Sequence, residues 1–108
     1  MERREIVLAR VFFSDSAESK VRPAIVLSDE KYNKNGYVLA ASITTSSDEF
    51  CIPISGSDAN CQLDKNSNAR FDGVNKLPSK QIIKKIGKIT PEFYSKLVDK
   101  IIGLIRNV

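Results

Sequence analysis

The apolar residues of this chain come in short runs interrupted by polar turns, and helical spacing is confined to the C-terminal segment. Asn35-Gly36 marks a turn before the third run, and Pro53 marks the fourth as an edge strand, because proline cannot donate to a ladder. The segments 14–20 and 55–68 are expected to be loops, and Leu77 to Lys80 should open a short helix or turn. Strands are expected at 6–13, 23–28, 37–43, 51–54, 69–74 and 86–89.

One helix is predicted after the last strand. Thr90-Pro91-Glu92 indicates its start, with Thr90 as N-cap, Pro91 at the first helical position and Glu92 near the positive end of the helix dipole. The residues that recur at helical spacing are Phe93, Leu97, Ile101, Leu104, Ile105 and Val108. We expect this face to pack on the sheet. Short strands followed by one helix predict a mainly β, α+β fold: a small antiparallel barrel with a C-terminal helix.

Composition is that of one globular domain spanning 1–108, with 42% hydrophobic and 28% charged residues. No apolar stretch approaches the ~18 residues of a membrane span, and the charged start Met1 to Glu5 is unlike a signal peptide, so we expect a cytoplasmic protein that does not contact membrane. The chain has no histidine, and Cys51 and Cys61 are too few for a Cys/His zinc site. We expect neither a metal nor a cofactor.

The charge balance favours an anionic partner. Lysine and arginine number 17 against 13 aspartate and glutamate residues, a net charge of +4. The same excess is equally consistent with a merely soluble, basic surface. A late concentration of lysines consists of Lys76, Lys80, Lys84, Lys85 and Lys88.

Three segments occur in an order that resembles a known family. They read VRPAIVLS at 21–28, ASITTS at 41–46, and RFD at 70–72 continuing to KIGKITPE at 85–92. Together they resemble the MazF/PemK toxins of type II toxin–antitoxin systems, over nearly the whole chain from Glu5 onward. The resemblance implies the SH3-like barrel with a C-terminal helix of CcdB/MazF-like toxins, usually as a homodimer.

The resemblance also implies an activity and a partner. Toxins of this family are metal-independent endoribonucleases that cut single-stranded RNA at short sequences, leaving a 2′,3′-cyclic phosphate and a 5′-hydroxyl. Their partner is a small antitoxin whose disordered, usually acidic tail blocks the RNA groove. The chain departs from the family in lacking histidine and in having Gly73 where glutamine is frequent.

Four residues match catalytic positions of the family. Arg22 matches its catalytic arginine, and a planar fork of donors suits a phosphate. Thr44 falls where a threonine hydroxyl contacts the scissile phosphate. Arg70 and Asp72 share a face if they lie on a strand, where Asp72 would accept the 2′-hydroxyl proton and Arg70 would stabilise the departing oxygen. From the residues alone, Arg22 could form a surface salt bridge and Arg70–Asp72 a structural ion pair.

Four further residues are predicted to contact RNA. Thr45 and Ser46 offer neutral donors beside Thr44, although this stretch is also typical of a solvated turn. Lys76 and Lys80 could follow RNA phosphates, although a solvated lysine-rich face is the commoner explanation. Two other functions remain open at this point: a CcdB-like toxin that binds DNA gyrase and cleaves nothing, and a non-catalytic barrel that serves as a binding module.

Overall fold

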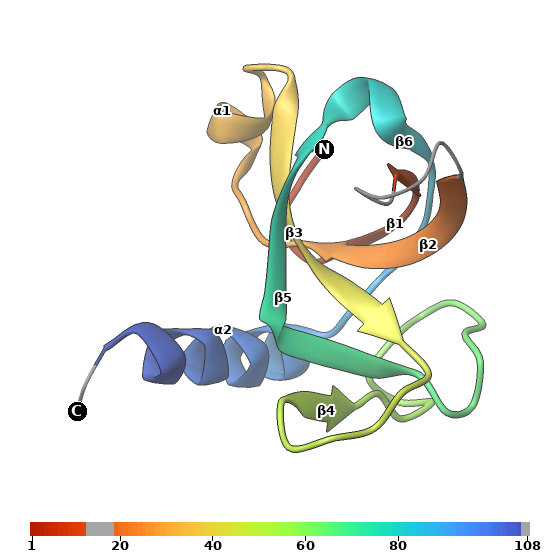
Figure 1. Cartoon of the computed structure of the whole chain (residues 1–108), viewed down its shortest axis with the longest axis vertical. Coiled ribbons are helices and arrows are strands. Elements are labelled where there is room, and N and C mark those ends of the chain that lie inside the picture. The colour runs from red at the N-terminus through yellow and green to blue at the C-terminus, as the bar shows by residue number, and fades with distance from the viewer. Residues whose placement is uncertain (13–18, 107–108) are drawn as a thin grey trace.

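Six strands form one antiparallel sheet in the order β4-β5-β3-β2-β1-β6 (Figure 1). A computed structural model of the chain describes residues 1–12 and 19–106. The elements are β1 (Glu5–Phe12), β2 (Ser19–Val26), α1 (Glu30–Asn33), β3 (Tyr37–Thr44), β4 (Cys51–Pro53), β5 (Asn68–Pro78), the 3₁₀ helix η1 (Ser79–Gln81), β6 (Ile82–Lys88) and α2 (Pro91–Ile105).

The predicted α+β class is confirmed, but the sheet is not closed into a barrel. β4 and β6 are the two edges of the sheet and do not pair. β4 has three residues and ends at Pro53, which has no N–H for a further ladder. The segment after β4 lies against the end of β6 instead. The backbone N–H of Asn60 donates to the carbonyl of Lys88 at 3.0 Å, and the side-chain oxygen of Asn60 accepts the N–H of Lys88 at 2.7 Å.

Several strands are longer than their apolar runs predict. β2 begins at Ser19 rather than at Pro23, and β6 begins at Ile82. β5 continues to Pro78, beyond the predicted end of this strand. Polar residues join these strands because a neighbouring strand supplies their backbone partners, as β1 does for Ser19. Segment 13–18, which includes most of the predicted loop 14–20, lies outside the described residues.

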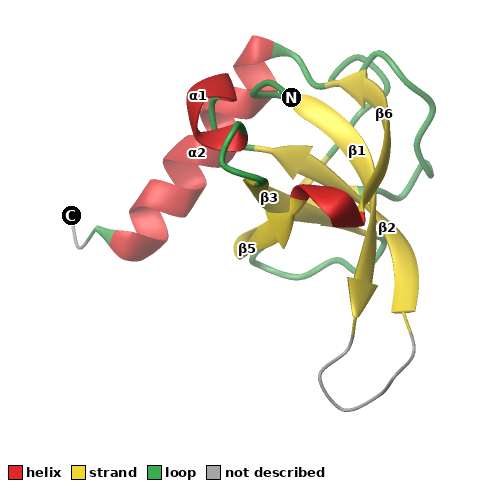
Figure 2. Cartoon of the chain, turned by 90° about the horizontal axis from the view of Figure 1, so that it is seen from above, coloured by secondary structure: helices red, strands yellow, loops and turns green. Residues whose placement is uncertain are grey.

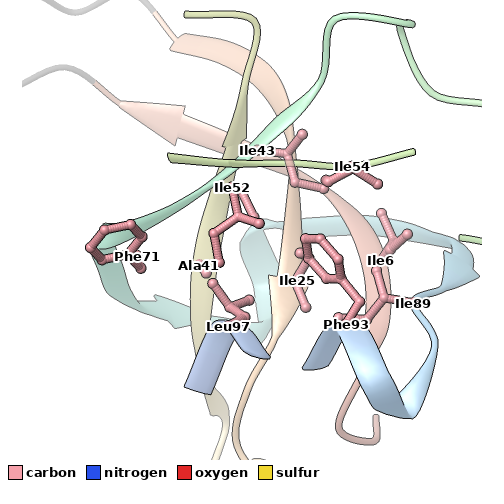
Figure 3. Close-up of a cluster of buried hydrophobic side chains, with 11 residues drawn as sticks. Ile6, Ile25, Ala41, Ile43, Ile52, Ile54, Phe71, Ile89, Phe93 and Leu97 are labelled. Carbon is pink, nitrogen blue, oxygen red and sulfur yellow. The ribbon is translucent and has the colours of Figure 1, made fainter. Parts of the chain in front are cut away.

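Two apolar clusters lie on opposite faces of the sheet. The larger cluster lies between the sheet and α2, and Figure 3 shows its side chains converging: Ile6, Ile25, Ala41, Ile43, Ile52, Ile54, Ala69, Phe71, Ile89, Phe93 and Leu97. The smaller cluster consists of Val7, Ala24, Val26, Val38 and Ala40, with Leu77 and Ile82 packed against it. Alternation along the central strands explains this division, since successive side chains point to opposite faces.

Helix α2 begins as its sequence predicts and ends beyond the sheet. The hydroxyl oxygen of Thr90 accepts from the N–H of Phe93 at 3.1 Å, which confirms the N-cap. Phe93 and Leu97 are buried, but the expectation that Leu104 and Ile105 pack on the sheet is wrong: they are 49% and 81% exposed. Figures 1 and 2 show the reason, because the last turns of α2 project past the strands.

The same expectation included Val108, which lies outside the described residues. Within residues 1–12 and 19–106, no helix is long and apolar enough to cross a membrane.

Candidate active site

A cavity of about 380 Å³ opens on the face of the sheet that carries the smaller apolar cluster. It lies over β2, β3 and β5, with one contribution from β1. Its apolar lining consists of Val11, Pro23, Ala24, Ala40, Ile43 and Leu77. Its polar lining consists of Arg22, Ser42, Thr44, Thr45, Ser46, Arg70 and Asn75. The cavity thus brings together five of the eight residues predicted from the sequence: Arg22, Thr44, Thr45, Ser46 and Arg70.

An irregularity in the pairing of β3 with β5 shapes this cavity. Ala41 pairs with Val74, whereas Ile43 pairs with Ala69, so a step of two residues on β3 corresponds to five on β5. Side chains alternate between the faces of a strand. The three extra residues on β5 therefore change which of its side chains face the cavity.

Arg70 and Asn75 both line the cavity as a result. They are five positions apart, and a regular strand would send their side chains to opposite faces. The apolar pattern of β5 did not reveal this irregularity, since it arises from pairing with β3.

Arg22 is an exposed side chain in the N-terminal half of β2, between exposed Val21 and half-buried Pro23. It lies opposite Ala9 of β1, and Ala24 on the same face belongs to the smaller apolar cluster. Within residues 1–12 and 19–106, its guanidinium makes no hydrogen bond or ion pair. The surface salt bridge that was the alternative for Arg22 is therefore not formed there, and its charge and donors are available to an anion.

Thr44 ends β3, and its hydroxyl is oriented by the turn that follows. The Oγ1 atom accepts the backbone N–H of Ser46 at 3.1 Å, so the hydroxyl proton remains free to be donated. The turn is anchored because the carbonyl of Ser46 accepts from the side-chain amide of Asn68 at 3.1 Å. Thr45 and Ser46 are exposed beside Thr44 and line the same cavity.

Arg70 is held by two carboxylates. Its Nε donates to Oδ1 of Asp72 at 2.9 Å and its Nη2 to Oδ2 at 3.2 Å, a two-point contact. Its Nη1 donates to Oδ2 of Asp48 at 3.0 Å and to the sulfur of Cys51 at 3.5 Å. Hydrogen bonds to Asp72 and Asp48 raise the pKa of Arg70, so it stays charged. Asp72 is exposed and does not line the cavity itself.

Asp48 is a member of this cluster that the sequence did not reveal. Its Oδ1 accepts the N–H of Phe50 at 2.8 Å, and this hydrogen bond, followed by the hydrogen bond and positive charge of Arg70, lowers the pKa of Asp48. Phe50 in turn contacts the ring of Phe71 edge-on, with centroids 6.0 Å apart. Asp48 lies 22 positions before Arg70 in a polar segment, so no local pattern connects the two.

Lys76 and Lys80 do not line the cavity. The ammonium of Lys76 lies 4.3 Å from the centroid of the Tyr37 ring. Lys80 lines a separate hollow with Arg10, Gln81 and Ile83. The rest of the lysine concentration is dispersed as well, since Lys85 pairs with Glu5 at 2.8 Å and Lys88 with Glu2 at 3.0 Å.

Ser42 and Asn75 are cavity residues that the sequence analysis did not single out. Ser42 lies on β3 opposite Ala24, and Asn75 lies on β5 opposite Ala40. The sequence held one indication that Ser42 could be a functional residue, because it is a small polar residue within an otherwise apolar strand. Among the residues that the structure describes, no group of three or more histidine, cysteine, aspartate or glutamate side chains is placed to hold a metal ion.

A family model of PemK-like, MazF-like toxins of type II toxin–antitoxin systems matches residues 2–105 of the chain. A search of curated protein sequences found no match.

Solved structures share the fold. A chain of a MazE-MazF crystal structure from Deinococcus radiodurans is 16% identical with a TM-score of 0.82, the alignment covering 97% of this chain and 95% of that one. An endoribonuclease in complex with its cognate antitoxin from a mycobacterial species is 16% identical, with a TM-score of 0.77 and coverage of 97% and 94%. The Mycobacterium tuberculosis toxin MazF-mt6 is 22% identical, with a TM-score of 0.72 and coverage of 94% for both chains.

Proposed function

The chain belongs to the PemK-like, MazF-like toxin family of type II toxin–antitoxin systems, and from this membership we propose that it is a metal-independent endoribonuclease acting on single-stranded RNA. One observation supports the proposal most strongly. The guanidinium of Arg22, which has no partner among residues 1–12 and 19–106, and the hydroxyl of Thr44 lie in one cavity, where both can donate to a phosphate.

The proposed reaction is an internal transfer at phosphorus. The ribose 2′-oxygen attacks the scissile phosphorus and loses its proton, a new P–O2′ bond forms, and the P–O5′ bond breaks. The products are a 2′,3′-cyclic phosphate and a 5′-hydroxyl, the departing 5′-oxygen taking a proton from solvent. Catalysis requires donors where negative charge develops and a base for the 2′-hydroxyl.

Arg22 and Thr44 are assigned to the phosphate. Arg22 binds two phosphate oxygens through its planar fork, and Thr44 donates one hydrogen bond from its hydroxyl. Thr45 and Ser46, exposed in the same turn, contribute further hydroxyl donors to the RNA. None of these groups requires a change of protonation state to act.

Asp72 is assigned as the base and Arg70 as its positioning partner. The two-point contact uses one lone pair on each carboxylate oxygen of Asp72, and each oxygen keeps another that can accept the 2′-hydroxyl proton. Arg70 lines the cavity and can also stabilise charge on the departing oxygen.

The proposal extends to the partners of the protein. Two of the similar structures contain a toxin with its antitoxin, which supports a cognate antitoxin for this chain. An acidic disordered tail would be attracted to the exposed charge of Arg22. We assign Lys76 and Lys80 to RNA phosphates beyond the cavity, and propose that the protein acts as a homodimer in the cytoplasm, where its RNA substrate lies.

The test is cleavage of a long single-stranded RNA in EDTA, with chemical analysis of the product ends. We expect discrete cuts that bear a cyclic phosphate, and loss of at least ~100-fold in rate for Arg22→Ala. The matched control is Arg106→Ala, since Arg106 is an exposed arginine at the end of α2, away from the cavity.

Two results would contradict the proposal. Intact RNA with folded wild-type protein would favour a toxin that acts on another target. If the wild type and Arg22→Ala cut RNA at the same rate, Arg22 would not be a catalytic residue.

A further inference from the structure

The side-chain amide of Asn75 is held in one orientation by its neighbours. Its Nδ2 donates to the carbonyl of Gly73 at 3.2 Å and to the hydroxyl of Ser42 at 3.3 Å. The Ser42 hydroxyl in turn donates to the same carbonyl at 3.3 Å. Three residues from two strands thus form a closed set of hydrogen bonds on the cavity wall.

Chemistry determines which end of the amide faces Gly73. A backbone carbonyl can only accept, so the amide nitrogen of Asn75 must point toward it. Both protons of that nitrogen are then engaged. The opposite atom, Oδ1, has no hydrogen-bond partner among residues 1–12 and 19–106, and Asn75 is exposed. The cavity wall therefore presents one acceptor whose position is fixed in advance.

Glycine at position 73 is part of this arrangement. A Cβ atom there would lie 3.2 Å from the Cβ of Arg70 and 3.4 Å from the hydroxyl oxygen of Ser42. The contact with Arg70 is tight and the contact with Ser42 is at ordinary van der Waals distance, so a side chain at position 73 would press mainly on Arg70 and fill the space beside Ser42.

Beside Asn75 the cavity is apolar. Ala40 lies opposite Asn75 in the ladder, and Ala24 and Leu77 line the same part of the cavity. These three residues also belong to, or pack against, the smaller apolar cluster. An apolar surface next to a fixed acceptor suits an aromatic heterocycle that carries an N–H donor at its edge.

We propose that Ser42, Gly73 and Asn75 form a base-reading subsite that accepts RNA bases with an exocyclic amino group and disfavours uracil. The inference rests on the proposed ribonuclease function and names the specificity of its cavity. The Oδ1 atom of Asn75 accepts from the amino group of adenine, cytosine or guanine. The two-point contact by which asparagine commonly reads adenine is unavailable, because Nδ2 is already engaged.

Uracil is disfavoured for a specific reason. It has no amino group, and its N3–H lies between two carbonyl oxygens that would approach Oδ1 of Asn75. A site built to accept a hydrogen bond loses affinity for an analogue that lacks the donor. One neutral hydrogen bond at an exposed site contributes little free energy, so we expect RNA with an amino-bearing base at this position to be cut about fivefold to tenfold faster than RNA with uracil there.

The first experiment maps the cuts that wild-type protein makes in a random RNA pool in EDTA. We expect uracil to be about fivefold to tenfold under-represented at one position next to the cut. A defined RNA substrate is then made in which the adenine at that position is replaced by purine, or the cytosine by 2-pyrimidinone. Each replacement removes only the exocyclic amino group of the base. Cleavage by wild-type protein should fall about fivefold to tenfold. This arm uses unaltered protein and does not depend on the folding of any variant.

The second experiment repeats both measurements with Asn75→Ala. In this variant, RNA with uracil at that position should be cut as fast as RNA with the other bases. Removal of the amino group should not lower the cleavage rate further. The control is Gln62→Ala, another exposed amide, which lies outside the cavity and makes no hydrogen bond within the described ranges. It should keep the wild-type preference.

The outcomes separate the two proposals. If wild-type protein cuts no RNA, the ribonuclease function fails and the subsite fails with it. If it cuts RNA but shows no preference against uracil at any position, or if its cleavage rate does not fall when the amino group is removed, the subsite alone is refuted. An unchanged preference in folded Asn75→Ala also refutes it.

Discussion

Arg22 and Arg70 line one cavity, but within the described residues only Arg70 has carboxylate partners. Asp72 and Asp48 neutralise Arg70 and hold its guanidinium in place. In the part of the chain that the structure describes, no group engages the donors of Arg22. The two arginines are therefore suited to different tasks, Arg22 to binding a phosphate and Arg70 to positioning a carboxylate.

The first prediction concerns the geometry of the cationic group at position 22. Arg22→Lys keeps a positive charge but loses the planar fork, so RNA cleavage should fall about tenfold to a hundredfold. The thermal midpoint should not change measurably, because Arg22 is exposed and has no partner within the described residues. Cleavage rates and thermal unfolding of the same preparations test both parts. A fully active lysine variant would show that charge alone is sufficient.

The second prediction concerns Asp48 and acid. The N–H of Phe50 and the guanidinium of Arg70 lower the pKa of Asp48 in the folded protein. A carboxylate with a lowered pKa contributes stability above its unfolded value of about 3.9, and this stability is lost as the pH falls through the folded value. Asp48→Asn should therefore lower the urea midpoint at pH 7 and have little effect near pH 2.

Urea titrations of the wild type and Asp48→Asn at several pH values provide the measurement. A constant difference between the two proteins from pH 7 to pH 2 would mean that the charge of Asp48 does not stabilise the fold.

The third prediction concerns a carboxylate that is almost fully buried. Glu5 is 5% exposed, and burial by itself would raise its pKa. Hydrogen bonds from Lys85 and from the N–H of Glu2 outweigh this effect and lower the pKa overall. Lys85→Ala leaves the charge of Glu5 without its main partner and should lower the urea midpoint at pH 7.

The neighbouring variant Lys84→Ala is the control, since Lys84 is exposed and has no ion pair among the described residues. Its urea midpoint should stay at the wild-type value. The effect of Lys85→Ala should shrink as the pH falls below about 4.3 and through the lowered pKa of Glu5, because the protonated carboxyl needs no counter-charge. Equal midpoints for the two variants at pH 7 would contradict this account.

The fourth prediction concerns Gly87 on β6. A Cβ atom there would lie 2.6 Å from the Cβ of Cys61 and 2.8 Å from the amide oxygen of Asn60, contacts that force a shift. Asn60 also accepts the N–H of Lys88 at 2.7 Å, so the shift would disturb the contact between segment 54–67 and β6. Gly87→Ala should destabilise the protein by about 1–3 kcal/mol in denaturant titrations.

Gly103→Ala is the opposite case and serves as the comparison. Gly103 lies within α2, where an added Cβ meets nothing within 4 Å. Alanine is the better helix former, so this variant should gain about 0.5–1 kcal/mol. If both variants shifted stability in the same direction, close packing at Gly87 would not be the cause.

Local sequence patterns predicted the elements whose causes are local. The start of α2 follows from the Thr90 cap and Pro91, and the short edge strand follows from Pro53. The approximate positions of the strands, the turn at Asn35-Gly36 and the α+β class could be predicted in the same way. The motifs around Arg22 and Thr44 identified two residues of the cavity before their surroundings were known.

Other features depend on contacts between residues far apart in the chain. The open edge between β4 and β6 and the exposure of Leu104 depend on where the sheet ends in space. The pairing of Asp48 with Arg70, and the shared cavity of Arg70 and Asn75, depend on how β5 meets β3. Hydrophobic periodicity and capping report on neighbours along the chain, whereas strand register is set by pairing across it. For this reason the sequence could predict where α2 begins and approximately where the strands lie. The ends of β2 and β6 and the register of β5 depended on pairing between strands, and that register decided which side chains meet in the cavity.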